Sequence, residues 1–190
     1  MNTLYFITHP QVVVDPAVPV PRWALSTVGL ARMRALLDQS WLPGVMRVFA
    51  STERKAMDGA EVLGRHLQLP VTQVAALGEI DRSTTGYLPP AEHEAITDEF
   101  FARPHVRVRG WEPAVNAQRR IVTAVSRLAA GPGDVAVVSH GAVGALLLCH
   151  LTDSEITRDH DQPGRGGGNY FAIRNEALLH GWRPIDESPR

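Results

Sequence analysis

Two histidines stand directly after short apolar segments, one near each end of the chain. His9 follows residues 4–8, LYFIT, and His140 follows residues 135–139, VAVVS. Apolar runs of this length that are rich in β-branched or aromatic residues are typical of buried strands. Open α/β sheets bind ligands at the carboxyl ends of their strands, so both imidazoles are expected at one site. A neutral imidazole there could act as a nucleophile, and a second could donate to an anion.

Three other residues have side chains or backbone properties suited to the transfer of a phosphoryl group. Arg54 stands at the start of an expected helix, where free N–H groups and its planar guanidinium both favour phosphate oxygens. Glu79 could protonate a leaving alcohol, with Asp81 as the competing carboxylate two residues later. Gly141, directly after His140, would let the backbone approach a ligand closely.

The order of these segments resembles that of the histidine phosphatase (phosphoglycerate mutase-like) superfamily. That family begins with a strand ending in Arg-His-Gly, where this chain has Thr8-His9-Pro10. The family motif Ser-x-x-x-Arg-Ala-x-x-Thr-Ala is similar to residues 50–60, ASTERKAMDGA, which have Gly59 at the threonine position. The remaining family motifs are Leu-x-Glu, Ser-His-Gly and a Leu-Ser/Thr-x-x-Gly helix opening, and they match residues 77–79, 139–141 and 25–29.

The resemblance implies a phosphatase that hydrolyses a small phosphomonoester through a phosphohistidine intermediate and needs no cofactor or metal. His9 would be the phosphoryl acceptor. Glu79 would be the proton donor and later the base that activates water. Arg54 and His140 would hold the phosphoryl oxygens. The expected substrate-binding residues are Thr8, Arg22, Ser51, Gly141 and Ala142.

Thr8 replaces an arginine that contacts the transferring phosphoryl group in the family. Loss of one donor aimed at transition-state charge costs on the order of 10²–10³ in rate. Three alternatives stay open: a slow phosphatase, a phosphatase in which Arg22 fills the gap, or a protein that binds phosphorylated ligands without turnover. Pro10 also lacks the backbone N–H that glycine could offer to phosphate.

Two further functions are weighed against these. A phosphoglycerate mutase-type phosphotransferase must hold phosphoglycerate and exclude water, and this short chain shows no extra segment devoted to that. A metal hydrolase would use His9, His140 and Glu79 as ligands. No clustered motif such as His-x-x-x-His accompanies these three residues.

The alternation of elements predicts a three-layer α/β/α sandwich around a mostly parallel sheet. A single domain, residues 1–190, is expected from the chain length. Strands are expected at residues 3–8, 45–51, 71–74, 135–139, 170–174 and 177–182. Helices are expected at residues 26–39, 53–67, 91–101, 112–130 and 142–151. Residues 78–111 are less regular and are expected to form a substrate lid.

Within this segment, four basic residues occupy every second position: Arg103, His105, Arg107 and Arg109. If residues 104–110 are extended, all four project from one face. They would then form a basic wall for an anionic substrate. The equal alternative is a solvated edge that discourages aggregation.

Composition limits the classes of partner. The formal net charge of -1 creates no field that favours nucleic acid or acidic membranes, so a phosphorylated small molecule is the expected partner. The first residues lack a signal-peptide pattern and no apolar run reaches membrane length, so a cytoplasmic location is expected. A single cysteine, Cys149, excludes an internal disulfide. The four tryptophans could serve a core or a homodimer face.

Overall fold

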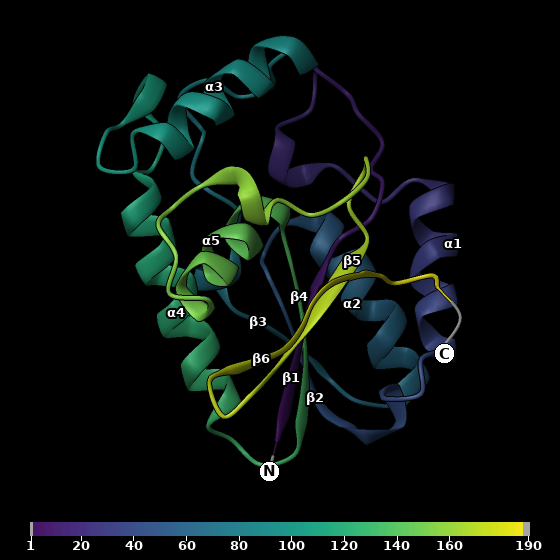
Figure 1. Ribbon diagram of the computed structural model, residues 1–190. Helices are drawn as coiled ribbons and strands as arrows, with labels where there is room; N and C mark the ends of the chain where they lie inside the picture. Colours follow the sequence, from purple (N-terminus) through teal and green to yellow (C-terminus); the bar gives the residue numbers. More distant parts are fainter. Residues whose placement is uncertain (1, 188–190) are drawn as a thin grey trace.

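The computed structural model describes residues 2–187, which form one six-stranded sheet with helices on both faces (Figure 1). The strands are β1 (Thr3–Thr8), β2 (Val45–Ala50), β3 (Val71–Gln73), β4 (Asp134–Ser139), β5 (Asn169–Arg174) and β6 (Ala177–Pro184). Their order in the sheet is β3-β2-β4-β1-β5-β6. Neighbours from β3 to β1 are parallel, whereas β5 is antiparallel to both β1 and β6.

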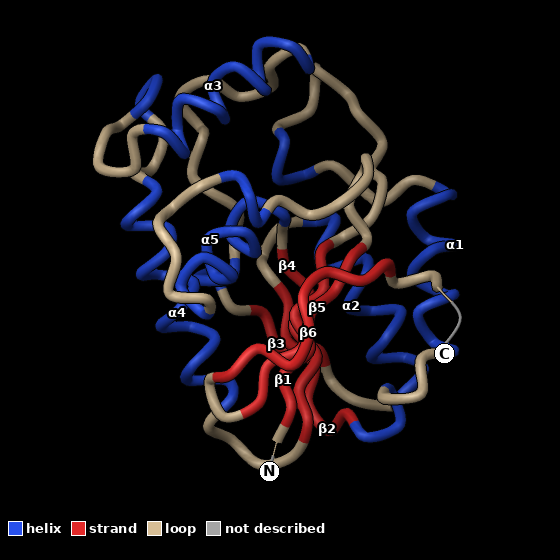
Figure 2. Tube along the Cα trace, viewed as in Figure 1, coloured by secondary structure: helices blue, strands red, loops and turns tan. Residues whose placement is uncertain are grey.

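Helices lie on both faces of this sheet and at the carboxyl ends of its parallel strands. α1 (Thr27–Ala35) and α2 (Arg54–Leu67) cover one face, and α4 (Ala114–Ala129) and α5 (Gly141–Leu151) cover the other. α3 (Pro90–Ala102) lies beyond the carboxyl ends of the parallel strands (Figure 2). Short 3-10 helices occur at Val20–Arg22, Leu36–Asp38, Leu42–Gly44, Ala75–Leu77, Val108–Gly110 and Arg158–His160. The predicted three-layer sandwich with a mostly parallel sheet is confirmed.

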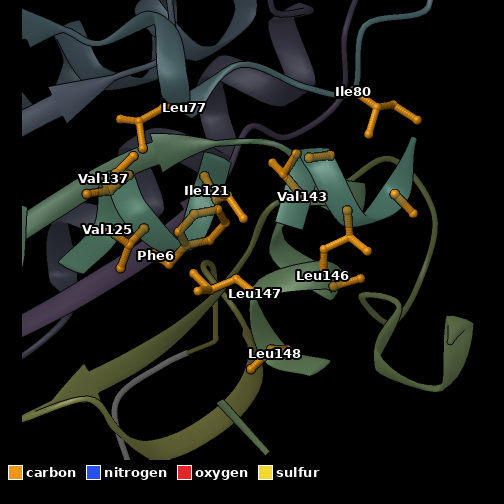
Figure 3. Packing of buried hydrophobic residues seen from close by; sticks show 14 of the residues in the cluster. Phe6, Leu77, Ile80, Ile121, Val125, Val137, Val143, Leu146, Leu147 and Leu148 are labelled. Carbon is orange, nitrogen blue, oxygen red and sulfur yellow. The ribbon is translucent and has the colours of Figure 1, made fainter. Parts of the chain in front are cut away.

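The central strand β1 joins two hydrophobic cores. All six of its residues are buried, as expected for a parallel strand covered by helices on both sides. Successive side chains point to opposite faces, so Phe6 packs in the core under α4 and α5, and Ile7 in the core under α1 and α2. Figure 3 shows Phe6 among Ile121, Leu147 and their neighbours. None of the helices within residues 2–187 is long and apolar enough to cross a membrane.

The pairing of β1 with β4 brings the two histidines together. Thr8 lies opposite Ser139 in the parallel register, so both strands end at the same level. The His9 N–H donates to the Ser139 carbonyl at 3.1 Å and extends the pairing by one residue. His9 and His140 therefore leave the sheet side by side, where α5 begins. Glu79 reaches the same region through the short helix Ala75–Leu77 that follows β3.

The extended arrangement considered for residues 104–110 is wrong. The Val106 N–H donates to the Arg103 carbonyl at 3.0 Å, and Arg109 adopts a left-handed backbone conformation with φ of 52°. These turns follow from the burial of Val108 and Trp111, which pull the segment against the core. The four alternating basic side chains therefore do not share one face.

Gly29 has no room for a side chain, and this generates a stability prediction. A Cβ at Gly29 would lie 2.2 Å from the backbone oxygen of Gln11, in the loop just after His9. Alanine normally stabilises a helix by about 1 kcal/mol relative to glycine, but overpacking costs about 1–3 kcal/mol and acts on backbone here. We expect Gly29→Ala to lower the free energy of unfolding in urea by about 1–3 kcal/mol.

The matched control is Gly181→Ala in β6, where a Cβ would meet no described atom within 4 Å. Its free energy of unfolding should stay within about 0.5 kcal/mol of the wild type. A Gly29→Ala protein as stable as the wild type would show that the loop after His9 can move away from α1.

Candidate functional site

The carboxyl edge of the sheet contains a cavity of about 280 Å³. His9, Glu79, Gly141 and Ala142 line it from the sheet side. Residues of α3 and of the segment before β5 complete the wall: His93, Glu94, Thr97, Phe101, Arg158, Asp161 and Gln162. The helix within the segment expected to form a lid, residues 78–111, thus supplies one side of the cavity. Whether that segment moves stays a prediction.

His9 is held in one tautomer by its neighbour. Its Nδ1 lies 2.9 Å from the Pro10 carbonyl oxygen, and because a carbonyl only accepts, Nδ1 carries the hydrogen. Nε2 is therefore the nitrogen with a free lone pair. Burial lowers the pKa of His9 to about 4, with the Pro10 hydrogen bond opposing that shift. His9 is neutral at pH 7, which is the form that can act as a nucleophile.

His140 is fully buried beside His9. The two ring centroids are 5.2 Å apart with planes at 70°. His140 Nε2 lies 2.8 Å from Ser51 Oγ and 3.4 Å from Glu53 Oε1, and Nδ1 has no partner among the described residues. Burial, followed by the nearby charge of His9, holds the pKa of His140 well below its usual value. The structure thus brings Ser51 to His140 rather than into the cavity lining.

Glu79 is bound to the amino terminus of α5. Its carboxyl group accepts from the backbone N–H groups of Ile80, Ala142 and Val143, each at 3.1 Å. Burial raises the pKa of Glu79, the charge of Glu53 raises it further, and these backbone donors oppose the rise. A carboxyl that keeps its proton to higher pH than usual is suited to act as a general acid.

Asp81, the competing carboxylate, is exposed and accepts from the Ser83 N–H at 3.0 Å. This contact lowers the pKa of Asp81. Asp81 does not line the cavity with His9. The geometry therefore favours Glu79 as the acid.

The structure corrects the position of the expected cation. The side chain of Arg54 is 63% exposed and pairs with Asp58 at 3.2 Å, whereas that of Lys55 is only 5% exposed. Lys55 Nζ donates to the Val20 carbonyl at 2.9 Å and to the Glu53 carboxylate. Adjacent residues on a helix do not face the same way, so only one of the two can point inward.

The sequence contained the signal that identifies Lys55. In Ser-x-x-x-Arg-Ala the cation directly precedes the alanine, and the residue between Ser51 and Ala56 at that place is Lys55, the single lysine of the chain. Arg22 is exposed and lies with Arg54 in a separate surface hollow. Arg22 therefore does not fill the gap that the threonine leaves.

Two charged residues of the site, Glu53 and Arg82, were not predicted from the sequence. The Glu53 carboxylate contacts Lys55, accepts from the Glu79 N–H at 3.1 Å and lies beside His140. Arg82 lines the cavity, and its charge helps to lower the pKa of His9. Because Glu53 forms an ion pair with Lys55, its negative charge offsets part of the positive charge expected at this site.

Thr8 lies behind the cavity wall. It is fully buried, and its Oγ1 lies 2.7 Å from Gln162 Oε1. Oγ1 also accepts from the Asn169 N–H at 3.0 Å. Gln162 lines the cavity, whereas Thr8 does not. Gln162 is the third residue of the site that was not predicted from the sequence.

The four alternating basic residues, Arg103, His105, Arg107 and Arg109, do not line this cavity. Arg103 pairs with Glu99 on the surface of α3. Residues 2–187 contain no group of three or more His, Cys, Asp or Glu side chains placed to hold one metal ion. The alternative metal site of His9, His140 and Glu79 therefore has no support in the geometry.

Comparisons with known proteins identify the same fold in solved structures. Among solved structures, Bacillus stearothermophilus YhfR superimposes with a TM-score of 0.79 at 20% identity, covering 95% of each chain. Mycobacterial glucosyl-3-phosphoglycerate phosphatase, in complex with inorganic phosphate, gives a TM-score of 0.76 at 21% identity, covering 99% of this chain and 100% of that chain. Phosphoglycerate mutase from Bacillus anthracis gives 0.68 at 16% identity, covering 97% and 93%.

These TM-scores show a shared fold. No curated protein matches the sequence. The family model of the histidine phosphatase superfamily (branch 1) matches residues 19–164, a span that begins after His9 and includes Lys55, Glu79 and His140. That match covers most of the chain, and the chain belongs to the histidine phosphatase superfamily.

Proposed function

We propose that the protein is a phosphatase that hydrolyses a small phosphomonoester through a phosphohistidine at His9. The observation that carries the proposal is the state of His9. Its Nδ1 is fixed by Pro10, it is neutral at pH 7, and it shares a cavity with Glu79. The mycobacterial phosphatase that shares this fold was solved with inorganic phosphate, which supports phosphate as the group bound here.

The reaction follows from these positions. His9 Nε2 forms a bond to phosphorus while the bond from phosphorus to the leaving oxygen breaks. Glu79 transfers its proton to that oxygen, so the product leaves as an alcohol. Water then attacks the phosphohistidine, Glu79 takes a proton from the water, and inorganic phosphate leaves with His9 restored.

Charge on the phosphoryl oxygens must be balanced throughout both steps. Lys55 and Arg82 lower the pKa of both His9 and His140 by their charge, and Arg120 also lowers that of His140. Glu53 offsets the charge of Lys55. The site therefore carries less positive charge than the family motif with its arginines implies.

This low charge favours one alternative, a protein that binds phosphorylated ligands with little or no turnover. The replacement of arginine by Thr8 and the Glu53–Lys55 pair both point in that direction. Trapping of a covalent intermediate separates the two functions, because only the phosphatase forms one.

The first test of the phosphatase is the covalent intermediate. Rapid quench with a phosphorus-labelled phosphomonoester should yield an acid-labile adduct that peptide mapping places on His9. His9→Ala should abolish the adduct and reduce phosphate release to the buffer rate. His150→Ala, on an exposed histidine of α5, should retain wild-type activity. Label on another residue would refute the assignment of the nucleophile.

The pH dependence provides a second test. His9 must be neutral, so kcat/KM should fall as pH drops through about 4. Glu79 must be protonated, so kcat/KM should fall as pH rises through a pKa above the ordinary value of 4.5. Glu79→Gln should remove this alkaline limb, and the comparison on one substrate cancels the titration of the substrate itself.

Glu79→Gln should also slow an alkyl phosphate by about 10²–10⁴, the usual contribution of general acid catalysis. Nitrophenyl phosphate should lose much less, because nitrophenolate leaves without protonation. An equal loss on both substrates would contradict the role of Glu79 as acid, and a larger loss from Asp81→Asn would transfer that role to Asp81.

The corrected cation gives a third test. A hydrogen bond to a charged group contributes about 1.5–3 kcal/mol, so Lys55→Met should lower kcat/KM by roughly tenfold to a hundredfold or more. Arg54→Met is the matched control on the neighbouring residue and should change kcat/KM by less than about twofold, because Arg54 is exposed. Lys55→Arg keeps the charge and should retain activity. A larger loss of kcat/KM in Arg54→Met than in Lys55→Met would show that Arg54, and not Lys55, is the cation of the site.

A further inference from the structure

Gln162 is placed in the cavity wall opposite the start of α5. It lines the cavity together with His9 and Gly141. A Cβ built on Gly141 would lie 2.3 Å from Gln162 Nε2, so the amide nitrogen packs directly against this glycine. Gln162 belongs to the loop between Arg158–His160 and β5, outside the family motifs matched at residues 25–29, 50–60, 77–79 and 139–141.

The hydrogen bonds around Gln162 fix which end of its amide faces the cavity. Asn169 Nδ2 lies 3.1 Å from the Pro163 carbonyl, which only accepts, so this atom is a donor. The same Nδ2 lies 3.2 Å from Gln162, and its partner there must therefore be the acceptor Oε1. Nε2 is the remaining end of the amide.

Thr8 strengthens this orientation. Thr8 Oγ1 accepts from the Asn169 N–H at 3.0 Å, and its hydroxyl hydrogen has two acceptors within reach, Gln162 Oε1 at 2.7 Å and the Asn169 carbonyl at 3.2 Å; the shorter contact favours donation to Oε1. Two donors thus hold the oxygen end of Gln162. The two N–H groups of Nε2 are left on the side of Gly141 and the cavity.

We propose that Gln162 Nε2 donates to an oxygen of the bound phosphoryl group and does the work of the arginine that Thr8 replaces. Thr8 and Asn169 are positioning residues that act through Gln162. This inference rests on the proposed phosphate site. Gln162 supplies a directional hydrogen-bond donor and adds no charge. The Glu53 carboxylate already reduces the net positive charge around Lys55.

A double-mutant cycle tests the proposal with two readouts, the affinity for inorganic phosphate by calorimetry and kcat/KM for a phosphomonoester. Gln162→Leu should weaken both by about tenfold to a hundredfold. Thr8→Val should weaken both in the same direction. Thr8→Val added to Gln162→Leu should cause no further loss of phosphate affinity, because Thr8 does not line the cavity and affects the phosphoryl group through Gln162. Gln73→Leu, on an exposed glutamine of β3, is the control and should match the wild type.

Gln162→Glu guards against a merely structural effect. It keeps the size of the side chain but presents an anionic oxygen where the N–H groups stand, so phosphate affinity should fall even in a protein with an unchanged melting temperature. Wild-type phosphate affinity and kcat/KM in both Gln162 variants would overturn the proposal. Independent, additive losses from the Thr8 and Gln162 substitutions would overturn the positioning role of Thr8.

The same experiments separate this inference from the proposed function. If the wild type binds phosphate through Gln162 but forms no phosphohistidine, the phosphatase fails and the donor role of Gln162 stands. If phosphohistidine forms equally in the wild type and in Gln162→Leu, the phosphatase stands and the role of Gln162 fails. A wild type that binds no phosphate would overturn both.

Discussion

In-register pairing of β1 with β4 holds His9 and His140 at the same edge of the sheet, and the other contacts of the site are built around that pair. The register is fixed by burial, because successive residues of β1 pack into different cores. A slip of one residue would turn every side chain of β1 to the opposite face. Core packing therefore sets the distance between the two imidazoles, because each follows a strand whose register the packing fixes.

Burial at this edge also determines the charges of the site. Both imidazoles are neutral at pH 7, because burial lowers their pKa values and nearby positive groups disfavour their protonated forms further. Lys55 lies beside them with the Glu53 carboxylate as its ion-pair partner, and an unpaired buried charge would be strongly destabilising. The pair leaves fewer free cations for a phosphoryl group, so directional donors such as an amide N–H carry more of its recognition.

Sequence reasoning succeeded where one physical signal dominated. Uninterrupted apolar runs predicted β1 and β4, and the polar residues at their ends predicted the pair of His9 and His140. It failed at Arg54 because two adjacent basic residues differ only in which side of α2 they occupy, and only the spacing to the neighbouring alanine distinguishes them. Gln162 lies in an irregular loop without periodicity, and its role arises from contacts with β1 and β5 that are distant in sequence.

Opposing influences set the pKa of Glu79 at the same edge of the sheet. The N–H groups at the start of α5 favour its ionised form, because they point at its oxygens from the positive end of the helix dipole. Burial and the Glu53 charge favour its protonated form, and their combined effect is larger. An acid held only by burial would give up its proton at a high cost, while one held only by N–H donors would lose its proton at a lower pH than an ordinary carboxyl does. In the proposed phosphatase, the opposition of the two influences is what lets Glu79 protonate the leaving oxygen and then accept a proton from water.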